Sequence, residues 1–324
     1  MKESEQRAKI LEFLKKDDKR HFSGEDISGR LGVSRAYVWK IISRLRDDGY
    51  SIEGSSNLGY ILRSSPGKVY DYEIKCGLNT EKFGKKNIYY HVEAGSTNDV
   101  AYLLAEEGAE EGTVVVSEKQ SGGKGRLGRK WVSPRGGIYM SLVLRPDMPL
   151  EDIPAVTLVA AVSTARAVRL FSGLEALIKW PNDIYIGGCK TGGILSEVKA
   201  HPDKVDFIVV GIGVNVNTPA NRLPAGGTSL KEAAGRPFDR PGLLRTILEC
   251  FETDYLDFKE KGFAAARNTC RELSCIMNNK VSIEARHMSL EGTVVDIDER
   301  GALMVEDAHG SIHRIFSGDV RSCG

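Results

Sequence analysis

The chain has 324 residues, enough for two or more domains of ordinary size. Hydrophobic residues make up 41% and charged residues 27% of it, and this composition excludes a disordered or fibrous chain. The formal net charge is only +1, and the longest apolar stretch, residues 153–168, is interrupted by polar residues and is too short to cross a membrane.

The N-terminal residues lack the apolar core and the cleavage site of a secretory signal, so we expect a cytoplasmic protein without a membrane span. The cysteines are scattered and contain no CxxC pair, which argues against a zinc or disulfide framework. We interpret all six as reduced and mostly structural thiols: Cys76, Cys189, Cys250, Cys270, Cys275 and Cys323.

Positive charge gathers in the first 63 residues, which contain 13 Lys and Arg against 10 Asp and Glu. Apolar spacing predicts a helix over residues 7–15 and a second helix from Ser23 to about Leu31. Residues 32–34, Gly-Val-Ser, form a short turn, and Ser34 can cap a third helix that runs to about Asp48. This order is typical of a helix-turn-helix.

Residues 27–46 contain five basic residues and no acidic one. Two short alternating segments, residues 50–52 and 60–62, follow the third helix and predict a β-wing. Arginine and lysine neutralise phosphates and reach base edges, so the segment is predicted to bind DNA. The candidate DNA-binding residues are Ser34, Arg35, Tyr37, Lys40 and Arg44. The alternative is a small helical bundle used for protein contacts.

Small and turn-forming residues at 64–67 predict a linker, after which strands and helices alternate. We expect a mixed α/β domain over residues 64–275, following a first domain over residues 1–63. Its strands are expected near residues 88–92, 113–118, 138–144, 177–180, 194–198 and 207–215. Its helices are expected near residues 98–107, 153–171 and 241–261.

The glycine-rich run GKGRLG at residues 123–128 is followed by a strand rather than a helix, so it is not a dinucleotide fingerprint. Together with Arg129 and Lys130 it predicts a flexible cationic flap over an anion. Residues 179–183, KWPND, end a strand, and Lys190 follows a short hairpin, so both lysines are expected to face one pocket. Taken singly, each lysine is more often a surface charge and each tryptophan a core residue. Together they favour phosphate handling.

Ser96, Thr97, Asn98 and Asp99 open a predicted helix. A helix cap is the simpler interpretation, and the alternative is that these hydroxyl and amide groups face a small polar ligand. The sequence contains no GxSxG elbow, no HExxH motif and no grouped metal ligands, which argues against nucleophilic or metal-dependent hydrolysis and against a fixed metal site.

Taken together and in this order, the motifs closely resemble the bifunctional biotin protein ligases that also act as the biotin operon repressor. The resemblance spans nearly the whole chain and rests on the winged head and on five motifs: STN at residues 96–98, Gln120 with GKGRLGRKW at residues 123–131, KWPND at residues 179–183, CKTGGIL at residues 189–195, and GIGVNVN at residues 211–217.

The resemblance implies an α+β multidomain protein with an N-terminal winged helix-turn-helix, a central mixed α/β ligase domain and a C-terminal SH3-like β-barrel. It implies two half-reactions, in which biotin and ATP form biotinyl-5'-AMP with Mg²⁺ and a lysine of the biotin carboxyl carrier protein of acetyl-CoA carboxylase then takes the biotin. It further implies that the adenylate favours a homodimer whose paired heads bind operator DNA.

The resemblance also implies residue roles. Biotin would be bound by Ser96, Thr97, Asn98, Gln120, Lys124, Gly125, Arg126 and Lys190. The nucleotide would be bound by Gly123, Lys124, Arg126, Arg129, Trp131, Lys179, Asn182 and Asn215. The catalytic residues would be Lys190, Lys179, Arg126 and Asp183.

The chain departs from the family at its cationic loop, which commonly contains GRGRRGR where this sequence has GKGRLGR. Lys124 keeps the charge but loses the bidentate fork of arginine, and Leu127 loses the charge, so we expect altered adenylate retention or dimerisation. Residues 276–324 alternate as short strands and resemble the family's C-terminal domain, to which we assign packing on the ligase domain and carrier docking.

Two other functions are alternatives to a ligase that also represses transcription. A regulator that senses biotin without ligating it would be favoured by loss of the cationic flap or of Lys190, and both are present. A lipoate ligase of similar fold would leave the DNA-binding head unexplained.

Overall fold

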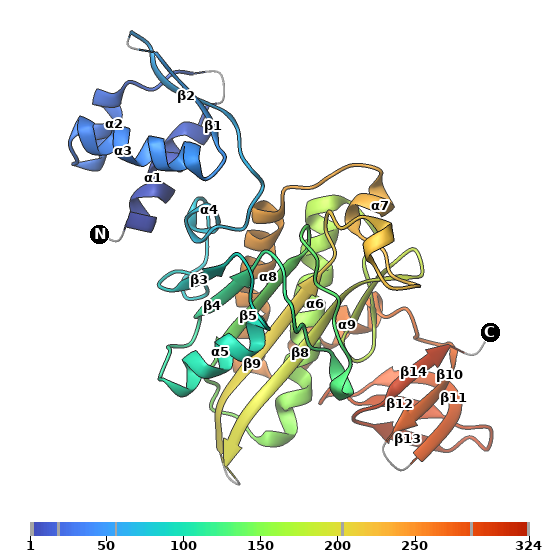
Figure 1. Ribbon diagram of the computed structural model, residues 1–324. Coiled ribbons are helices and arrows are strands. Elements are labelled where there is room, and N and C mark those ends of the chain that lie inside the picture. The colour runs from blue at the N-terminus through green and yellow to red at the C-terminus, as the bar shows by residue number, and fades with distance from the viewer. Residues whose placement is uncertain (1–2, 18–19, 56, 202–203, 286–287, 323–324) are drawn as a thin grey trace. The chain divides into compact units, whose positions relative to one another are not determined.

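The structure is a computed structural model that describes residues 3–17, 20–55, 57–201, 204–285 and 288–322 (Figure 1). The chain forms two compact units. The first runs to Asn79 and includes Asp239–Arg245, and the second comprises Thr80–Phe238 and the chain from Thr246 onward. The predicted domain boundaries after residues 63 and 275 remain predictions.

The first unit contains the three predicted helices, which are α1 (Glu3–Lys15), α2 (Gly24–Leu31) and α3 (Arg35–Asp47). Ser23 caps α2 by accepting a hydrogen bond from the amide of Asp26, and Ser34 caps α3 in the same way from Tyr37. Between them Gly32 takes a left-handed conformation, with φ of 65°, that ends α2 at little steric cost. The helix-turn-helix prediction is confirmed.

Two antiparallel strands, β1 (Ser51–Ser55) and β2 (Gly59–Ser64), form the predicted wing. The short helix α4 (Asp71–Lys75), which the sequence did not predict, also belongs to this unit. Its buried Glu73 accepts a hydrogen bond from the Tyr50 hydroxyl and pairs with Lys15 of α1. Burial raises the pKa of Tyr50, which keeps its hydroxyl protonated as the donor. The head core therefore continues past the predicted linker.

The second unit is built on a seven-stranded mixed sheet in the order β3-β4-β5-β9-β8-β7-β6. Only β3 and β4 are parallel, and the other neighbours are antiparallel. The strands are β3 (Ile88–His91), β4 (Val114–Ser117), β5 (Ile138–Leu144), β6 (Leu177–Lys179), β7 (Asp183–Ile186), β8 (Cys189–His201) and β9 (Lys204–Val214). Figure 1 shows β8 and β9 as long neighbouring strands.

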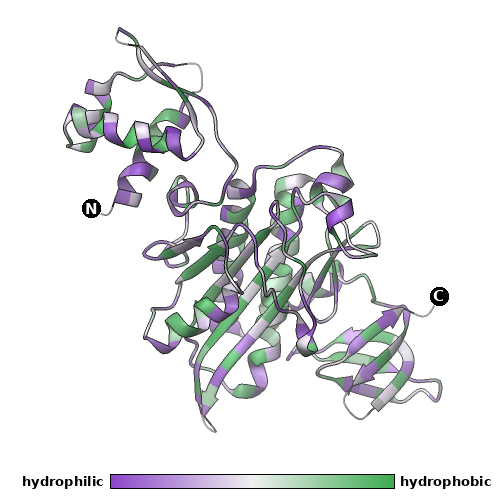
Figure 2. Cartoon of the chain, viewed as in Figure 1, coloured by the Kyte–Doolittle hydropathy of each residue, from purple (hydrophilic) through white to green (hydrophobic). Residues whose placement is uncertain are grey.

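Helices cover both faces of this sheet. Helix α5 (Thr97–Glu106) packs over β4, β5 and β9, and helix α6 (Ile153–Ser172) packs over β6 to β9. Successive side chains of β8 point to opposite faces of the sheet: Glu197 bonds to Asn98 of α5, whereas Ser196 bonds to Thr157 of α6. Figure 2 shows apolar residues running along β4 and β5 between these layers. The remaining helices are α7 (Leu230–Ala234), α8 (Arg240–Lys261) and α9 (Ala264–Leu273).

Among the described residues, one segment, Leu150–Ser172, is long and apolar enough to span a membrane by length and composition. It contains α6, and 67% of its apolar window is buried inside the protein. Its hydrophobicity is thus accounted for by packing against the sheet. The described cysteines, Cys76 to Cys275, are all free thiols, and Cys323 lies outside the described residues.

The C-terminal part of the second unit is a five-stranded antiparallel sheet in the order β13-β12-β11-β10-β14. Its strands are β10 (Lys280–Ala285), β11 (Met288–Ile297), β12 (Leu303–Glu306), β13 (Ile312–Ile315) and β14 (Asp319–Ser322). Residues 298–301 lie between β11 and β12, and residues 308–310 lie between β12 and β13. The sheet is consistent with the prediction, and closure into an SH3-like barrel remains an expectation.

A buried carboxylate on α8 fixes residues 81–83, at the start of the second unit. Glu252 accepts hydrogen bonds from the backbone amides of Glu81, Lys82 and Phe83 at 2.6 to 3.0 Å. We expect Glu252→Ala to lower the free energy of unfolding by about 3 kcal/mol, because it leaves three backbone amide donors, that of the buried Phe83 among them, without their acceptor. Urea denaturation followed by fluorescence measures this. Glu260→Ala, which removes an exposed carboxylate from the same helix, serves as the control. Equal midpoints for the two variants would contradict the prediction.

Candidate active site

A cavity of about 460 Å³ opens in the second unit. Of the fifteen predicted biotin-binding, nucleotide-binding and catalytic residues, thirteen line it: Ser96, Thr97, Asn98, Gln120, Lys124, Gly125, Arg126, Arg129, Trp131, Lys179, Asn182, Asp183 and Lys190. The structure therefore brings together motifs that are far apart in the sequence. Gly123 and Asn215 lie elsewhere: Gly123 borders a second hollow behind the flap, and Asn215 bonds to Thr228.

One end of the cavity is lined by the polar side chains of Ser96, Thr97, Asn98 and Gln120. Ser96 occupies the N-cap position of α5, yet its side chain makes no capping hydrogen bond, so the simple cap interpretation fails for its hydroxyl. Gln120 caps the start of the helix instead, because its Oε1 accepts a hydrogen bond from the Thr97 amide at 2.7 Å. The Gln120 amide nitrogen donates to Ser133 Oγ at 2.8 Å, which fixes the orientation of the side chain.

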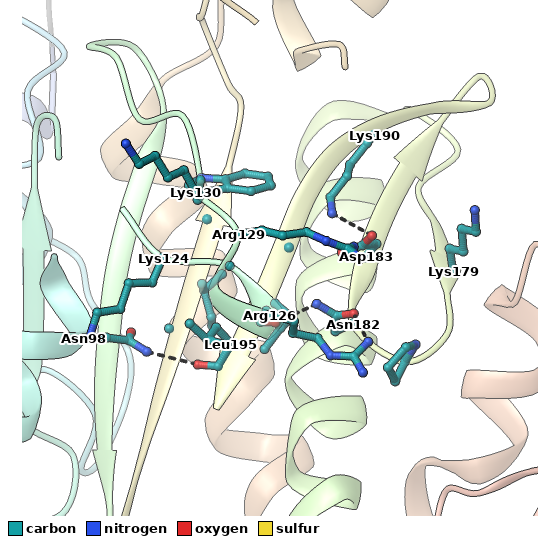
Figure 3. A pocket seen from close by; sticks show the side chains of 18 of the residues that line it. Asn98, Lys124, Arg126, Arg129, Lys130, Lys179, Asn182, Asp183, Lys190 and Leu195 are labelled. Atoms are coloured by element: carbon teal, nitrogen blue, oxygen red, sulfur yellow. Dashed lines mark hydrogen bonds and ion pairs between the residues drawn. The ribbon is translucent and has the colours of Figure 1, made fainter. Parts of the chain in front are cut away.

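Asn98 is the centre of this polar end and is only 4% exposed. Its Nδ2 donates to Glu197 at 2.7 Å and to the carbonyl of Leu195 at 3.2 Å (Figure 3). Its Oδ1 accepts from Ser141 Oγ at 2.6 Å. Two strands, β5 and β8, thus hold one amide in a single orientation. Ser141 could not be predicted as a site residue, because it lies in the apolar run of β5 and carries no local motif.

The opposite end of the cavity, here called the cationic end, contains Arg126, Arg129, Lys179 and Lys190, with Asp183 beside them (Figure 3). Over the whole cavity seven of the described lining residues are basic and two are acidic: Lys124, Arg126, Arg129, Lys130, Lys179, Lys190 and Arg321 against Asp183 and Asp319. An excess of this size in a concave site favours a ligand with several negative charges. Lys190 Nζ lies 2.6 Å from Asp183 Oδ2, as Figure 3 shows. Lys179 lies apart from that pair, 5.4 Å from the ring centre of Tyr185.

The cationic flap forms a short hairpin-like loop, in which the amide of Gly125 donates to the carbonyl of Arg129 at 2.7 Å. Its cations point to different walls of the cavity. Lys124 pairs with Asp99 and lies 3.6 Å from Glu197, and the hydrogen bond with Asp99 raises the pKa of Lys124. Arg126 donates to Asn182 Oδ1 at 3.1 Å, and burial lowers the pKa of Arg126.

The C-terminal sheet supplies a wall that sequence reasoning missed. Gly318, Asp319, Val320 and Arg321 line the cavity. Asp319 pairs with Arg129 of the flap, and the carbonyl of Gly318 accepts from Arg126 at 3.4 Å. Packing and docking were the only roles expected of this domain, and the structure adds contact with the flap. Leu127, at the tip of the flap, is 71% exposed and has a positive φ of 56°.

Two buried polar atoms at the cationic end have no hydrogen-bond partner within the described part of the chain: Trp131 Nε1 and Asp183 Oδ1. The Trp131 ring lies 5.5 Å from Lys190 Nζ. Buried polar atoms in native proteins usually have partners, so unpartnered atoms that face a cavity are typical of groups that a ligand satisfies. In the residues that the structure describes, no group of three or more His, Cys, Asp or Glu side chains could hold a metal ion.

Comparisons with known proteins agree with this site. Three family models match: an HTH domain over residues 6–61, the biotin/lipoate A/B protein ligase family over residues 93–215, and the biotin protein ligase C terminal domain over residues 278–321. The biotin protein ligase from Aquifex aeolicus, solved in complex with biotin and ATP, is 30% identical with a TM-score of 0.65, and the match covers 74% of this chain and all of that one.

Full-length relatives extend the similarity to the head. The bifunctional ligase/repressor BirA of Bacillus subtilis is 40% identical over 319 residues, which is 97% of this chain and 98% of that protein. The protein of the same name from Escherichia coli is 29% identical over 92% of both chains. The chain belongs to the family of bifunctional biotin protein ligases that also act as biotin operon repressors.

Proposed function

We propose that this protein joins biotin to a lysine of an acceptor protein in an ATP-dependent reaction and represses transcription through its head. The observation that carries the ligase activity is the cavity itself, in which a fixed group of polar side chains stands in a lining with seven basic and two acidic residues. Such a cavity suits one ligand with a neutral polar ring and a second ligand with phosphates. The repressor activity is supported by the helix-turn-helix and by the full-length relatives.

We assign the biotin ring to the polar end. Thr97, Asn98 and Gln120 present fixed donors and acceptors there, and Ser96 adds a hydroxyl that the helix does not use. Lys124 and Gly125 of the flap lie over this end. In this arrangement the biotin carboxylate points toward Lys190.

We assign the triphosphate of ATP to the cationic end. In the first half-reaction a biotin carboxylate oxygen attacks the α-phosphorus, the bond from that phosphorus to the bridging oxygen breaks, and pyrophosphate leaves. The chemistry needs no protein nucleophile, because the main task is to hold two anions together and to stabilise charge at phosphorus. Lys190, Arg126 and Lys179 supply positive charge, and Asn182 orients Arg126. The unpartnered Trp131 Nε1 borders the space given to the nucleotide. Gly123, Arg129 and Asn215 remain predicted nucleotide contacts.

In the second half-reaction the acceptor lysine attacks the carbonyl carbon of biotinyl-5'-AMP, and AMP leaves. The attacking amine must lose a proton, and Asp183 has a free carboxylate oxygen, Oδ1, in the cavity. We propose that Asp183 receives that proton. The acceptor is proposed to be the biotin carboxyl carrier protein of acetyl-CoA carboxylase, and Mg²⁺ is proposed to arrive with the phosphates of ATP.

Regulation is proposed to couple the two activities in the cytoplasm. The adenylate orders the flap, a homodimer forms, and paired heads bind a palindromic operator. Such coupling requires the adenylate to bind the dimerising state more tightly than the monomer. Titration of operator DNA with and without biotin and ATP measures it, and an affinity that biotin and ATP leave unchanged would overturn the coupling.

The ligase activity is tested by incubating the purified protein with biotin, ATP, Mg²⁺ and a carrier domain. We expect intact-mass spectrometry to show one added biotinyl group on the carrier, and none when ATP is omitted. If this protein adds no biotin to a carrier that a known ligase does modify, the result would favour the alternative, a biotin-sensing regulator without ligase activity. Lys124 and Leu127 would then be the first residues to exchange for arginine.

A further inference from the structure

Helix α3 of the head presents an exposed aromatic residue. Trp39 is 61% exposed, although its helix buries Val38, Ile41, Ile42 and Leu45 on the opposite side. A large aromatic side chain gains free energy by leaving water, so one that stays mostly exposed on a folded surface is typical of an interaction site. Lys40, the next residue, and Arg35, the first residue of α3, are also exposed.

Two of the side chains predicted to contact DNA are engaged within the head. The Tyr37 hydroxyl donates to Gln6 of α1, and Arg44 pairs with Glu3 of the same helix. Both side chains are only partly exposed. They therefore position α3 against α1, while Arg35, Trp39 and Lys40 remain on the outer face.

The charge around Trp39 indicates the kind of partner. Residues 27–46 contain no acidic side chain, Lys40 directly follows Trp39, and Arg35 lies four residues before it on the same helix. Helix α3 begins at the cap of Ser34, directly after the turn of the helix-turn-helix, which is where such motifs place the residues that reach base edges. Arg46 donates to the carbonyl of Ile52 at 2.8 Å and so fixes the wing to the end of α3. A cationic face with an aromatic centre and a fixed wing matches a DNA duplex.

We propose that Trp39 reads sequence by packing its indole against the C5 methyl group of a thymine in the major groove, while Arg35 and Lys40 contact phosphates. Apolar side chains distinguish thymine from the other bases through this methyl group. The inference rests on the proposed repressor function and adds a specificity-determining residue to it.

The first test measures DNA binding by the full chain in the presence of biotin and ATP. The probe is a fluorescent duplex that the wild-type protein selects from a random-sequence library. We expect Trp39→Ala to weaken binding to this duplex about tenfold, which is the usual effect of losing one base contact, without changing the salt dependence. Trp39→Phe should restore part of the affinity. Lys40→Ala should instead reduce the salt slope by about one.

The matched control is Leu170→Ala, which removes an apolar side chain that is 71% exposed on α6 of the second unit. It should bind the duplex like the wild type. Because Trp39 makes few contacts in the folded head, its variants are expected to keep the thermal midpoint of the wild-type protein, and this is measured in parallel.

The second test replaces each thymine of the selected duplex by deoxyuridine, which lacks only the methyl group. We expect the wild-type protein to lose affinity at one thymine in each half-site, and Trp39→Ala to be indifferent to that replacement. If the wild type binds the duplex specifically but Trp39→Ala shows equal affinity and equal deoxyuridine sensitivity, the inference is wrong and the repressor function stands. If the wild type selects no sequence at all, the repressor function fails and the inference fails with it.

Discussion

Lys190→Ala is expected to lower the rate of biotinyl-5'-AMP formation by about 10²- to 10³-fold, the usual effect of removing one fixed donor from a site that stabilises developing negative charge. Lys190 lines the cavity, pairs with Asp183 at 2.6 Å and lies 5.5 Å from the Trp131 ring. These contacts hold its ammonium group at the cationic end of the cavity. Pyrophosphate release under saturating biotin and ATP measures the effect.

Two controls separate a chemical role for Lys190 from a structural one. Lys199→Ala removes a lysine from the same strand, β8, where it pairs with Glu106 away from the cavity, and this variant should release pyrophosphate at the wild-type rate. Supplying synthetic biotinyl-5'-AMP to Lys190→Ala bypasses the first half-reaction, so transfer to the carrier should be impaired much less than adenylate formation. Near-normal pyrophosphate release by Lys190→Ala would refute the proposed role.

The head could be predicted in detail because its signals are local. Ser23, Gly32 and Ser34 each act within a few residues, and the structure places all three at the expected helix ends. Helix α4 was missed because it is only five residues long and is stabilised by packing on α1 rather than by its own sequence. Helix α9 was not predicted either, although its sequence contained a signal for it: the buried Ala266, Cys270 and Leu273 follow helical spacing.

The site was predicted less completely because its geometry depends on contacts between distant segments. A strand was expected near residues 194–198, with Lys190 before it, but β8 begins at Cys189 and includes Lys190. Pairing with β7 and β9 extends the strand through glycines of low strand propensity. The wall formed by residues 318–321 had no motif at all. Its role follows from the pairing of Asp319 with Arg129, which are 190 residues apart.

Gly211→Ala is expected to damage the polar end of the cavity. Gly211 lies on β9 between Ser141 of β5 and Leu195 of β8, and Asn98 bonds to both of these neighbours directly above it. A Cβ atom at position 211 would lie 2.1 Å from Asn98 Oδ1. Asn98 is buried and held by two strands, β5 and β8, so it cannot rotate away without losing its hydrogen bonds.

We therefore expect Gly211→Ala to weaken biotin binding by at least about tenfold and to destabilise the protein by about 1 to 3 kcal/mol, as overpacking of a well-packed site usually does. Isothermal titration calorimetry and thermal unfolding measure the two effects. The matched control is Gly95→Ala, because a Cβ atom there meets nothing within 4 Å. Wild-type biotin affinity in Gly211→Ala would mean that Asn98 does not border the biotin ring, and the ring would then have to be assigned to another part of the cavity.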